Sequence, residues 1–143
     1  MTSPLEERRK VTTMREILFH GKRKDNGEWV EGFLYITHSG EYEIGRYDPK
    51  LKIERITFVV DPETVGQFTG LTDRNGKKIF EGDVLLLDDI KGFVNYGTGC
   101  FCVKMSNPDY LFRNNPAIDI VLNEYPGLEV IGNIHDNPEL LEG

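Results

Sequence analysis

Glycine-containing turns recur along this sequence and divide it into short segments, and this feature constrains the fold more than any other. Asn26-Gly27 and Asn75-Gly76 suit tight hairpin turns, in which a residue must adopt positive φ. The segments HSGE (38–41) and Gly97-Thr98-Gly99 have the composition of two further turns. Between the turns the chain is rich in aromatic and β-branched residues, which favour strands. We therefore expect a chain built mainly from strands.

The expected strands follow the apolar and alternating segments between these turns. They cover residues 15–22, 29–36, 41–47, 54–60, 67–71, 84–89, 91–97, 99–105 and 128–134. The three strands between residues 84 and 105 form a meander of the kind that builds a small SH3-like barrel. The predicted fold class is therefore mainly β, a β-rich α+β fold with N-terminal hairpins, a C-terminal SH3-like small barrel and short helical pieces.

Two of these helical pieces are marked by proline after a capping residue. DPET (61–64) has the pattern of a single helical turn, with Asp61 as the cap and Pro62 at the first helical position. Near the end of the chain, Asn137 precedes PELLE (138–142), which predicts a short C-terminal helix.

The segment NNPAIDIVLNEYPG (114–127) fits two structures. Its apolar residues have helical spacing, with Asn115 as a cap and Pro116 in the first turn. Its β-branched run also fits a strand. We favour the helix by a narrow margin.

The length of 143 residues suits one domain that buries its own core without metals or disulfides. We expect residues 1–13 to be a flexible polar leader. Residues 14–143 would form a single domain, with an N-terminal β part (14–66) and an SH3-like part (67–143). No apolar run of about 18 residues predicts a membrane span, and no apolar region near the start predicts a secretory signal. These features predict a cytoplasmic protein.

Acidic residues dominate the charge of the chain. The formal net charge is −7, and the first 13 residues, with two Glu and three basic residues, sum to +1, so the remainder carries −8. No Lys or Arg follows Arg113, whereas six acidic residues do. Such a surface repels phosphate backbones, which disfavours broad electrostatic binding of nucleic acid.

The stretch QFTGLTDRNGKKIFEGDVLLL (67–87) is the most patterned part of the sequence. Its acidic residues adjoin turns, where Asp bonds its own backbone and Gly supplies positive φ. The glycine spacing fits neither an EF-hand nor a phosphate-binding loop. We therefore expect scaffold residues, no catalytic, metal or cofactor-binding residue, and no enzyme. An unrecognised enzyme would instead need a buried cluster such as Asp83, Asp88 and His135.

The two cysteines, Cys100 and Cys102, would point to the same face of a strand. They are too close in sequence to form a disulfide without distorting the backbone. None of the three histidines is paired at metal-ligand spacing. We interpret the cysteines as small apolar strand residues and expect no cofactor.

The segment GLTDRNGKKIFEGD (70–83) resembles the hallmark segment of the phage YopX-like proteins. MREILFHGKRKDNGEWVEGF (14–33) and LEVIGNIHDNPELL (128–141) are similar to the N-terminal hairpin and the C-terminal signature of that family. The resemblance implies a phage or prophage origin, a β-rich fold with an SH3-like C-terminal part, homo-oligomers and a bacterial host cytoplasm. It supplies no catalytic residue. The matching residues are Gly70, Leu71, Asp73, Gly76, Lys77, Ile79, Phe80, Glu81, Gly82 and Asp83.

The leading functional hypothesis is a non-enzymatic phage accessory protein that acts through protein contacts, above all with copies of itself. It rests on the lack of a recognisable site and on more aromatic residues than one small core needs. Exposed aromatic residues are typical interface anchors. If these aromatic residues all lay in the core instead, they would not support an interface. The aromatic residues concerned are Trp29, Phe33, Tyr35, Tyr42 and Tyr47.

The alternative hypothesis is a nucleic-acid-associated role. Small β-barrels often bind nucleic acid through aromatic and basic faces. A related possibility is an acidic surface that mimics DNA and blocks a nucleic-acid enzyme. The candidate interaction patch consists of Lys22, Arg23, Lys24, Arg46 and Tyr47.

Overall fold

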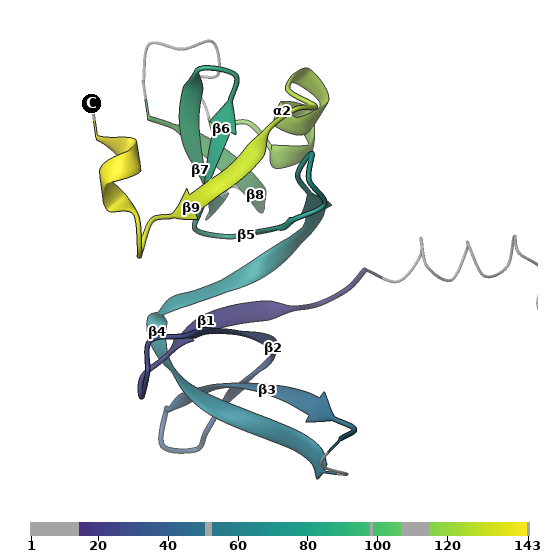
Figure 1. Cartoon of the computed structure of the whole chain (residues 1–143), viewed down its shortest axis with the longest axis vertical. Coiled ribbons are helices and arrows are strands. Elements are labelled where there is room, and N and C mark those ends of the chain that lie inside the picture. Colours follow the sequence, from purple (N-terminus) through teal and green to yellow (C-terminus); the bar gives the residue numbers. More distant parts are fainter. Residues whose placement is uncertain (1–14, 51–52, 98, 107–114, 143) are drawn as a thin grey trace, which may run out of the picture.

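A computed structural model describes residues 15–50, 53–97, 99–106 and 115–142, so the expected leader lies outside the described residues. The described residues form two antiparallel sheets, one below the other in Figure 1, and the prediction of a β-rich fold is confirmed. The five-stranded sheet contains β1 (Phe19–Arg23), β2 (Trp29–Ile36), β3 (Tyr42–Asp48), β4 (Ile53–Thr72) and β5 (Lys78–Phe80). The four-stranded sheet contains β6 (Asp83–Leu87), β7 (Ile90–Gly97), β8 (Cys100–Met105) and β9 (Glu129–Asn133). Among the described residues there are two helical elements, α2 (Ile118–Glu124) and the 3-10 helix η1 (Pro138–Leu141).

The first four strands form a closed ring, because β1 pairs with both β2 and β4 while β3 joins the other edges of those two strands. Glycine permits close approach within this ring. A Cβ atom added to Gly21 would lie 3.1 Å from the side chain of Val60, and one added to Gly32 would lie 1.9 Å from the carbonyl oxygen of Gly45. Ile44 and Val60 are fully buried. The ring is therefore narrow, and larger side chains at these glycines would not fit inside it.

Strand β4 is continuous over 20 residues, so the helical turn predicted at DPET (61–64) is wrong. The Thr64 hydroxyl donates a hydrogen bond to the Asp61 carbonyl (2.6 Å) and accepts one from the Lys22 backbone N–H (2.9 Å). The pairing register between β1 and β4 shifts between His20 and Lys22. The segment that resembles a helix cap is therefore an irregularity within a strand. Pairing with β1 keeps the DPET segment extended, and no local sequence pattern predicts this pairing.

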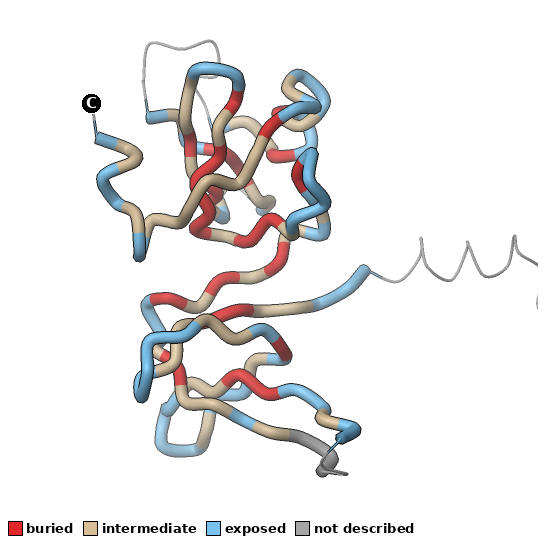
Figure 2. The backbone as a smooth tube through the Cα atoms, in the orientation of Figure 1, coloured by how far each residue is buried: buried red, intermediate tan, exposed pale blue. Residues whose placement is uncertain are grey.

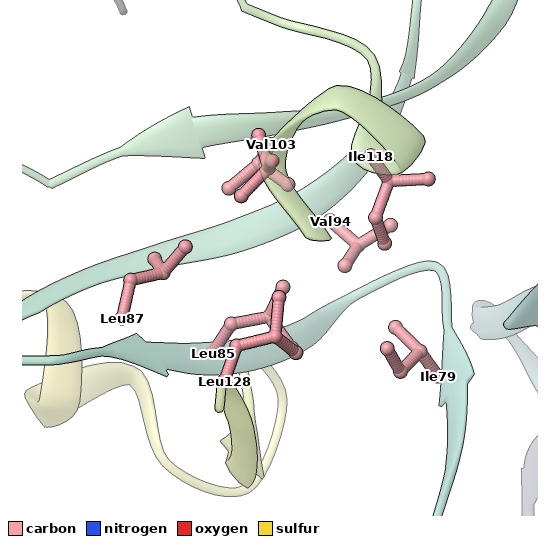
Figure 3. Close-up of a cluster of buried hydrophobic side chains, with 8 residues drawn as sticks. Ile79, Leu85, Leu87, Val94, Val103, Ile118 and Leu128 are labelled. Carbon is pink, nitrogen blue, oxygen red and sulfur yellow. The ribbon is translucent and has the colours of Figure 1, made fainter. Parts of the chain in front are cut away.

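The four-stranded sheet has the order β8-β7-β6-β9, and its pairings confirm the predicted meander from β6 to β8. Its main core lies between this sheet, α2 and β5, as Figure 3 shows. The SH3-like closure of this part stays a prediction. The buried members of the core cluster are Ile79, Leu85, Leu87, Val94, Val103, Ile118, Val121 and Leu128.

The helix favoured after Pro116 is confirmed as α2, but the predicted cap is wrong. The N-terminal capping position is Ala117, and no side chain caps this helix. The chain first pairs with the edge of β8, where the Val103 N–H donates to the Pro116 carbonyl (3.0 Å) and Cys102 forms a bridge with Ala117. This pairing holds the backbone extended up to Ala117, so the helix starts too late for Asn115 to cap it.

Strand β4 also runs from the ring towards the four-stranded sheet (Figure 1). The predicted division between residues 66 and 67 falls inside this strand, which pairs with β1 and β3 in the ring and then with β5. Figure 2 shows that buried residues are most frequent around the four-stranded sheet and along β4. The division into an N-terminal and a C-terminal part stays a prediction.

Candidate functional site

A pocket of about 420 Å³ lies where the ring faces the four-stranded sheet. Strands β1 and β2 line it on one side, and the β5 region, β6 and β9 line it on the other. A ligand in this pocket would contact both sheets. Its charged and aromatic lining residues are His20, Trp29, Glu31, Lys77, Lys78, Phe80 and Asp83.

His20 lies at the centre of an aromatic stack in this pocket. Its ring is parallel to that of Phe80, with centroids 4.0 Å apart and an interplanar angle of 6°. It is tilted against the ring of Trp29, with centroids 4.6 Å apart. Burial, helped by the charge of His135, lowers the pKa of His20 to about 4. The imidazole is therefore neutral at physiological pH.

Asp83 contributes a buried carboxyl group at the start of β6. Its Oδ2 atom accepts a hydrogen bond from the Phe80 backbone N–H at 2.8 Å. Burial raises the pKa of Asp83 to about 7, and the opposing effects of this hydrogen bond and of the Lys77 charge do not cancel the shift. Asp83 therefore changes its protonation state near physiological pH.

Asp136 links the ring to the residues that follow β9. Its Oδ1 accepts a hydrogen bond from the Lys22 ammonium (2.6 Å), and its Oδ2 accepts one from the Trp29 indole N–H (2.7 Å). Asn133 also donates to Oδ2, at 3.3 Å. These hydrogen bonds, that of Lys22 first, lower the pKa of Asp136 to about 2. Sequence analysis missed this link because Asp136 lies 107 residues after Trp29 and no local pattern connects them.

Asp73 is the structural centre of the patterned stretch at residues 67–87. One carboxylate oxygen accepts hydrogen bonds from the backbone N–H groups of Asn75 and Lys77, both at 2.9 Å. The other accepts from the Val130 N–H at 3.0 Å. Burial alone would raise the pKa of Asp73, but these three hydrogen bonds lower it. Asp73 thus shapes the turn and attaches it to the edge strand β9.

The other residues of the motif serve turns, the core or the pocket. Gly70, Gly76 and Gly82 have φ values of 88°, 79° and 94°, which favour glycine. Ile79 is fully buried, and Leu71 packs against the same core. The Glu81 carboxylate accepts a hydrogen bond from the backbone of β4. Three residues of the motif also line the pocket: Lys77, Phe80 and Asp83.

Strands β2 and β3 expose several large aromatic side chains. The exposed fractions are 41% for Phe33, 46% for Tyr35 and 64% for Tyr47. The other two aromatic residues considered as anchors, Trp29 and Tyr42, are half-buried. Three of the five candidate anchors are therefore available at the surface.

The family model described as YopX protein matches residues 18–142. The chain belongs to the YopX family. The crystal structure of protein EF1440 from Enterococcus faecalis is also similar, with 25% sequence identity and a TM-score of 0.53, over 90% of this chain and 100% of that chain. No curated protein matches the chain. The resemblance drawn from the three sequence segments is thus confirmed.

In this YopX-family chain, part of the predicted basic patch is assembled around Phe58. The guanidinium groups of Arg23 and Arg46 lie 4.4 Å and 5.7 Å from the centroid of its ring. Tyr47 follows Arg46 on β3, and neighbouring strand residues point to opposite faces. Arg46 and Tyr47 therefore do not form one surface.

Ion pairs offset two cations of the same patch. Arg23 pairs with Asp25, and Lys22 pairs with Asp136, both at 2.6 Å. Lys24 is exposed. The patch therefore carries less uncompensated positive charge than its sequence suggests.

The cluster that would have indicated an enzyme is not assembled. Asp83 is buried at the start of β6, whereas Asp88 is exposed in the turn beyond the other end of that strand, with φ of 56°. His135 is exposed. The part of the chain that the structure describes also contains no group of three or more His, Cys, Asp or Glu arranged to hold a metal ion.

Cys100 and Cys102 lie on the edge strand β8. Their sulfur atoms are 3.5 Å apart, and no disulfide joins them. None of the helices within the described residues has the length and apolar character needed to cross a membrane.

Proposed function

We propose that this protein is a non-enzymatic accessory protein of phage or prophage origin that assembles with copies of itself. The contact would be made by the aromatic face, defined here as Phe33, Tyr35 and Tyr47. One observation carries the proposal, namely the exposure of these three side chains on one side of the ring. Aromatic residues of this kind are enriched as anchors of protein interfaces. The phage origin rests on the resemblance of the sequence to phage YopX-like proteins.

Strand pairing brings the aromatic face together. Phe33 pairs with Gly45, and Tyr35 pairs with Glu43. The ring of Phe33 covers Gly45, since a Cβ atom added there would lie 2.4 Å from its Cζ atom. Directly paired residues share a face of the sheet, and Tyr47 lies two residues beyond Gly45 on β3. The three aromatic side chains therefore line one outer surface of the ring.

The distribution of charge permits a second copy of the chain as the partner. The acidic residues of α2, β9 and η1 belong to the half of the molecule that contains the four-stranded sheet (Figure 1). Two copies with a net charge of −7 each can meet through β2 and β3 while those acidic elements stay apart. A patch that contacts its own copy also suits the two-fold symmetry that most homodimers adopt.

Light scattering coupled to size-exclusion chromatography tests this proposal over a range from micromolar to near-millimolar protein. We expect the wild-type chain to form a discrete oligomer. The triple variant Phe33→Ser, Tyr35→Ser, Tyr47→Ser should be monomeric, with an unchanged far-UV circular dichroism spectrum. A wild-type protein that stays monomeric at every concentration would rule the proposal out.

Tyr96→Ser is the matched control, because Tyr96 is an aromatic residue of β7 that is 57% exposed on the other sheet. This variant should remain oligomeric. If it dissociates and the triple variant does not, the contact surface lies on the four-stranded sheet and the proposed face is wrong.

A further inference from the structure

We propose that the pocket between the two sheets binds a nucleoside monophosphate, with the base beside Trp29 and the phosphate at Lys77. This proposal does not depend on self-association, because the aromatic face lies elsewhere on the ring. The pocket volume of about 420 Å³ falls within the range of small-molecule sites, about 300–1,000 Å³. Such a volume suits one nucleotide better than a polymer.

The aromatic wall of the pocket is fixed before any ligand enters. The indole N–H of Trp29 is bound to Asp136, and Lys22 holds the other oxygen of that carboxylate. His20, which also lines the pocket, contacts both Trp29 and Phe80 and so helps to fix the wall. A planar base gains most from an aromatic surface that is already oriented, since little side-chain freedom is then lost on binding.

The charges of the pocket favour an anion. Lys78 pairs with Glu31 at 3.7 Å, so these two charges largely offset each other. The ammonium group of Lys77 takes part in no ion pair with another described residue. His20 is neutral at physiological pH because its pKa is about 4. Lys77 is thus the cation best placed to receive a phosphate group, through a charge-assisted hydrogen bond.

The Asp83 carboxyl group makes this binding sensitive to pH. In its protonated form it donates a hydrogen bond to an anion, whereas its ionised form repels one. Its pKa of about 7 places the change in the range where binding is measured. Among the residues lining the pocket, β9 contributes no titratable group. The charges of Lys77 and Asp73 act on Asp83, and His20 from β1, Glu31 from β2 and Lys78 from β5 line the same pocket. His135 lies beside Gly82, the residue before Asp83.

Trp29 provides a direct readout, because it is the only tryptophan in the chain. We would titrate the full chain with AMP, adenosine and inorganic phosphate, following Trp29 fluorescence and confirming affinities by calorimetry. AMP should give a saturable change, and adenosine and phosphate should each bind at least about tenfold more weakly. The Kd for AMP should rise up to about fivefold from about pH 7 to about pH 8, a range in which the phosphate of AMP is already mostly dianionic.

Two variants and one control separate this site from nonspecific binding. Lys77→Gln should weaken AMP binding about tenfold. Asp83→Asn should abolish this rise in Kd between about pH 7 and about pH 8. Lys104→Gln, which changes an exposed cation on the distant edge strand β8, should have no effect.

Four results would overturn the proposal. They are the absence of a saturable response to millimolar AMP, equal affinities of the Lys77 and Lys104 variants, phosphate binding as tight as AMP binding, and tighter binding of a single-stranded oligonucleotide. The last result would assign the pocket to nucleic acid, contrary to the proposed mononucleotide.

Discussion

His20 and Asp83 both line the pocket, and burial disfavours the charged form of each. Folding lowers the pKa of His20 from 6.5 to about 4. Between these two pH values the imidazole is protonated in the unfolded chain and neutral in the folded chain. The stabilising effect of neutral His20 is complete above about pH 6.5 and is lost as the pH falls towards 4. The pKa of Asp83 rises from 3.8 to about 7. Its favourable contribution is complete below about pH 3.8 and is lost as the pH rises through 7.

Between about pH 4 and about pH 6.5, His20 makes the free energy of unfolding rise with pH and Asp83 makes it fall, so the two effects partly offset each other in the wild-type protein. Asp83→Asn removes the fall caused by Asp83 and leaves the rise caused by His20. Relative to wild type, the free energy of unfolding of this variant should increase by about 2 to 4 kcal/mol between about pH 4 and about pH 7. Urea unfolding followed by Trp29 fluorescence at a series of pH values measures this difference. Asp89→Asn, a substitution in an exposed turn, should give a curve of unfolding free energy against pH that is parallel to that of wild type. A parallel curve for Asp83→Asn would contradict the prediction.

At the scale of elements, β4 depends on a glycine where it leaves the ring. Gly66 pairs with His20 of β1, and on its other side it approaches the backbone after β5. A Cβ atom at this position would lie 2.4 Å from the carbonyl oxygen of Glu81. This carbonyl is backbone and cannot rotate away, and the ring of buried His20 lies 3.3 Å from the same position. A larger residue must therefore displace β4 or the turn before β6.

Gly66→Ala should destabilise the protein by about 1 to 3 kcal/mol, because the added methyl group overpacks the junction between strand and turn. Chemical unfolding at neutral pH measures this loss. Gly127→Ala is the matched control, since an added Cβ atom there would meet no heavy atom within 4 Å. A similar loss in both variants would show that the close approach at Gly66 is unimportant.

Elements governed by local chemistry were predictable from the sequence. The turns at Gly27, Gly40 and Gly76 have positive φ as their composition suggested, and the alternating segments between them form strands. The DPET segment was misassigned because a cap and a strand irregularity use the same Asp and Thr hydrogen bonds. Only pairing with β1 distinguishes them. Most of the pocket was also not predictable, since contacts such as that between Trp29 and Asp136 join distant residues.

At the scale of the whole molecule, Asp136 connects the two sheets through Lys22 and Trp29. Asp136→Ala should reduce the free energy of unfolding by about 1 kcal/mol, because solvent screening limits the value of a partly exposed ion pair. The pKa of Asp136 is about 2, so its contribution is complete above about pH 3.8 and is lost as the pH falls towards 2. The difference in unfolding free energy between Asp136→Ala and wild type should therefore become smaller as the pH falls over the same range.

Thermal unfolding of both proteins measures this effect, and the fluorescence maximum of Trp29 should change as its indole N–H loses Asp136. Asp25→Asn, which affects an ion pair within the β1–β2 hairpin, should leave that fluorescence unchanged. An Asp136→Ala protein with wild-type fluorescence and stability would show that the link between the sheets does not stabilise the fold.

The closed ring of β1 to β4 has a consequence for synthesis of the chain. During translation β1 meets β2 within a few residues, but its other edge must wait until β4 has left the ribosome. Until then that edge presents unpaired backbone groups to other chains. The last step of ring formation also brings together segments far apart in sequence, which slows folding. The N-terminal half of a nascent chain therefore remains open to mispairing until the residues of the hallmark segment begin to emerge.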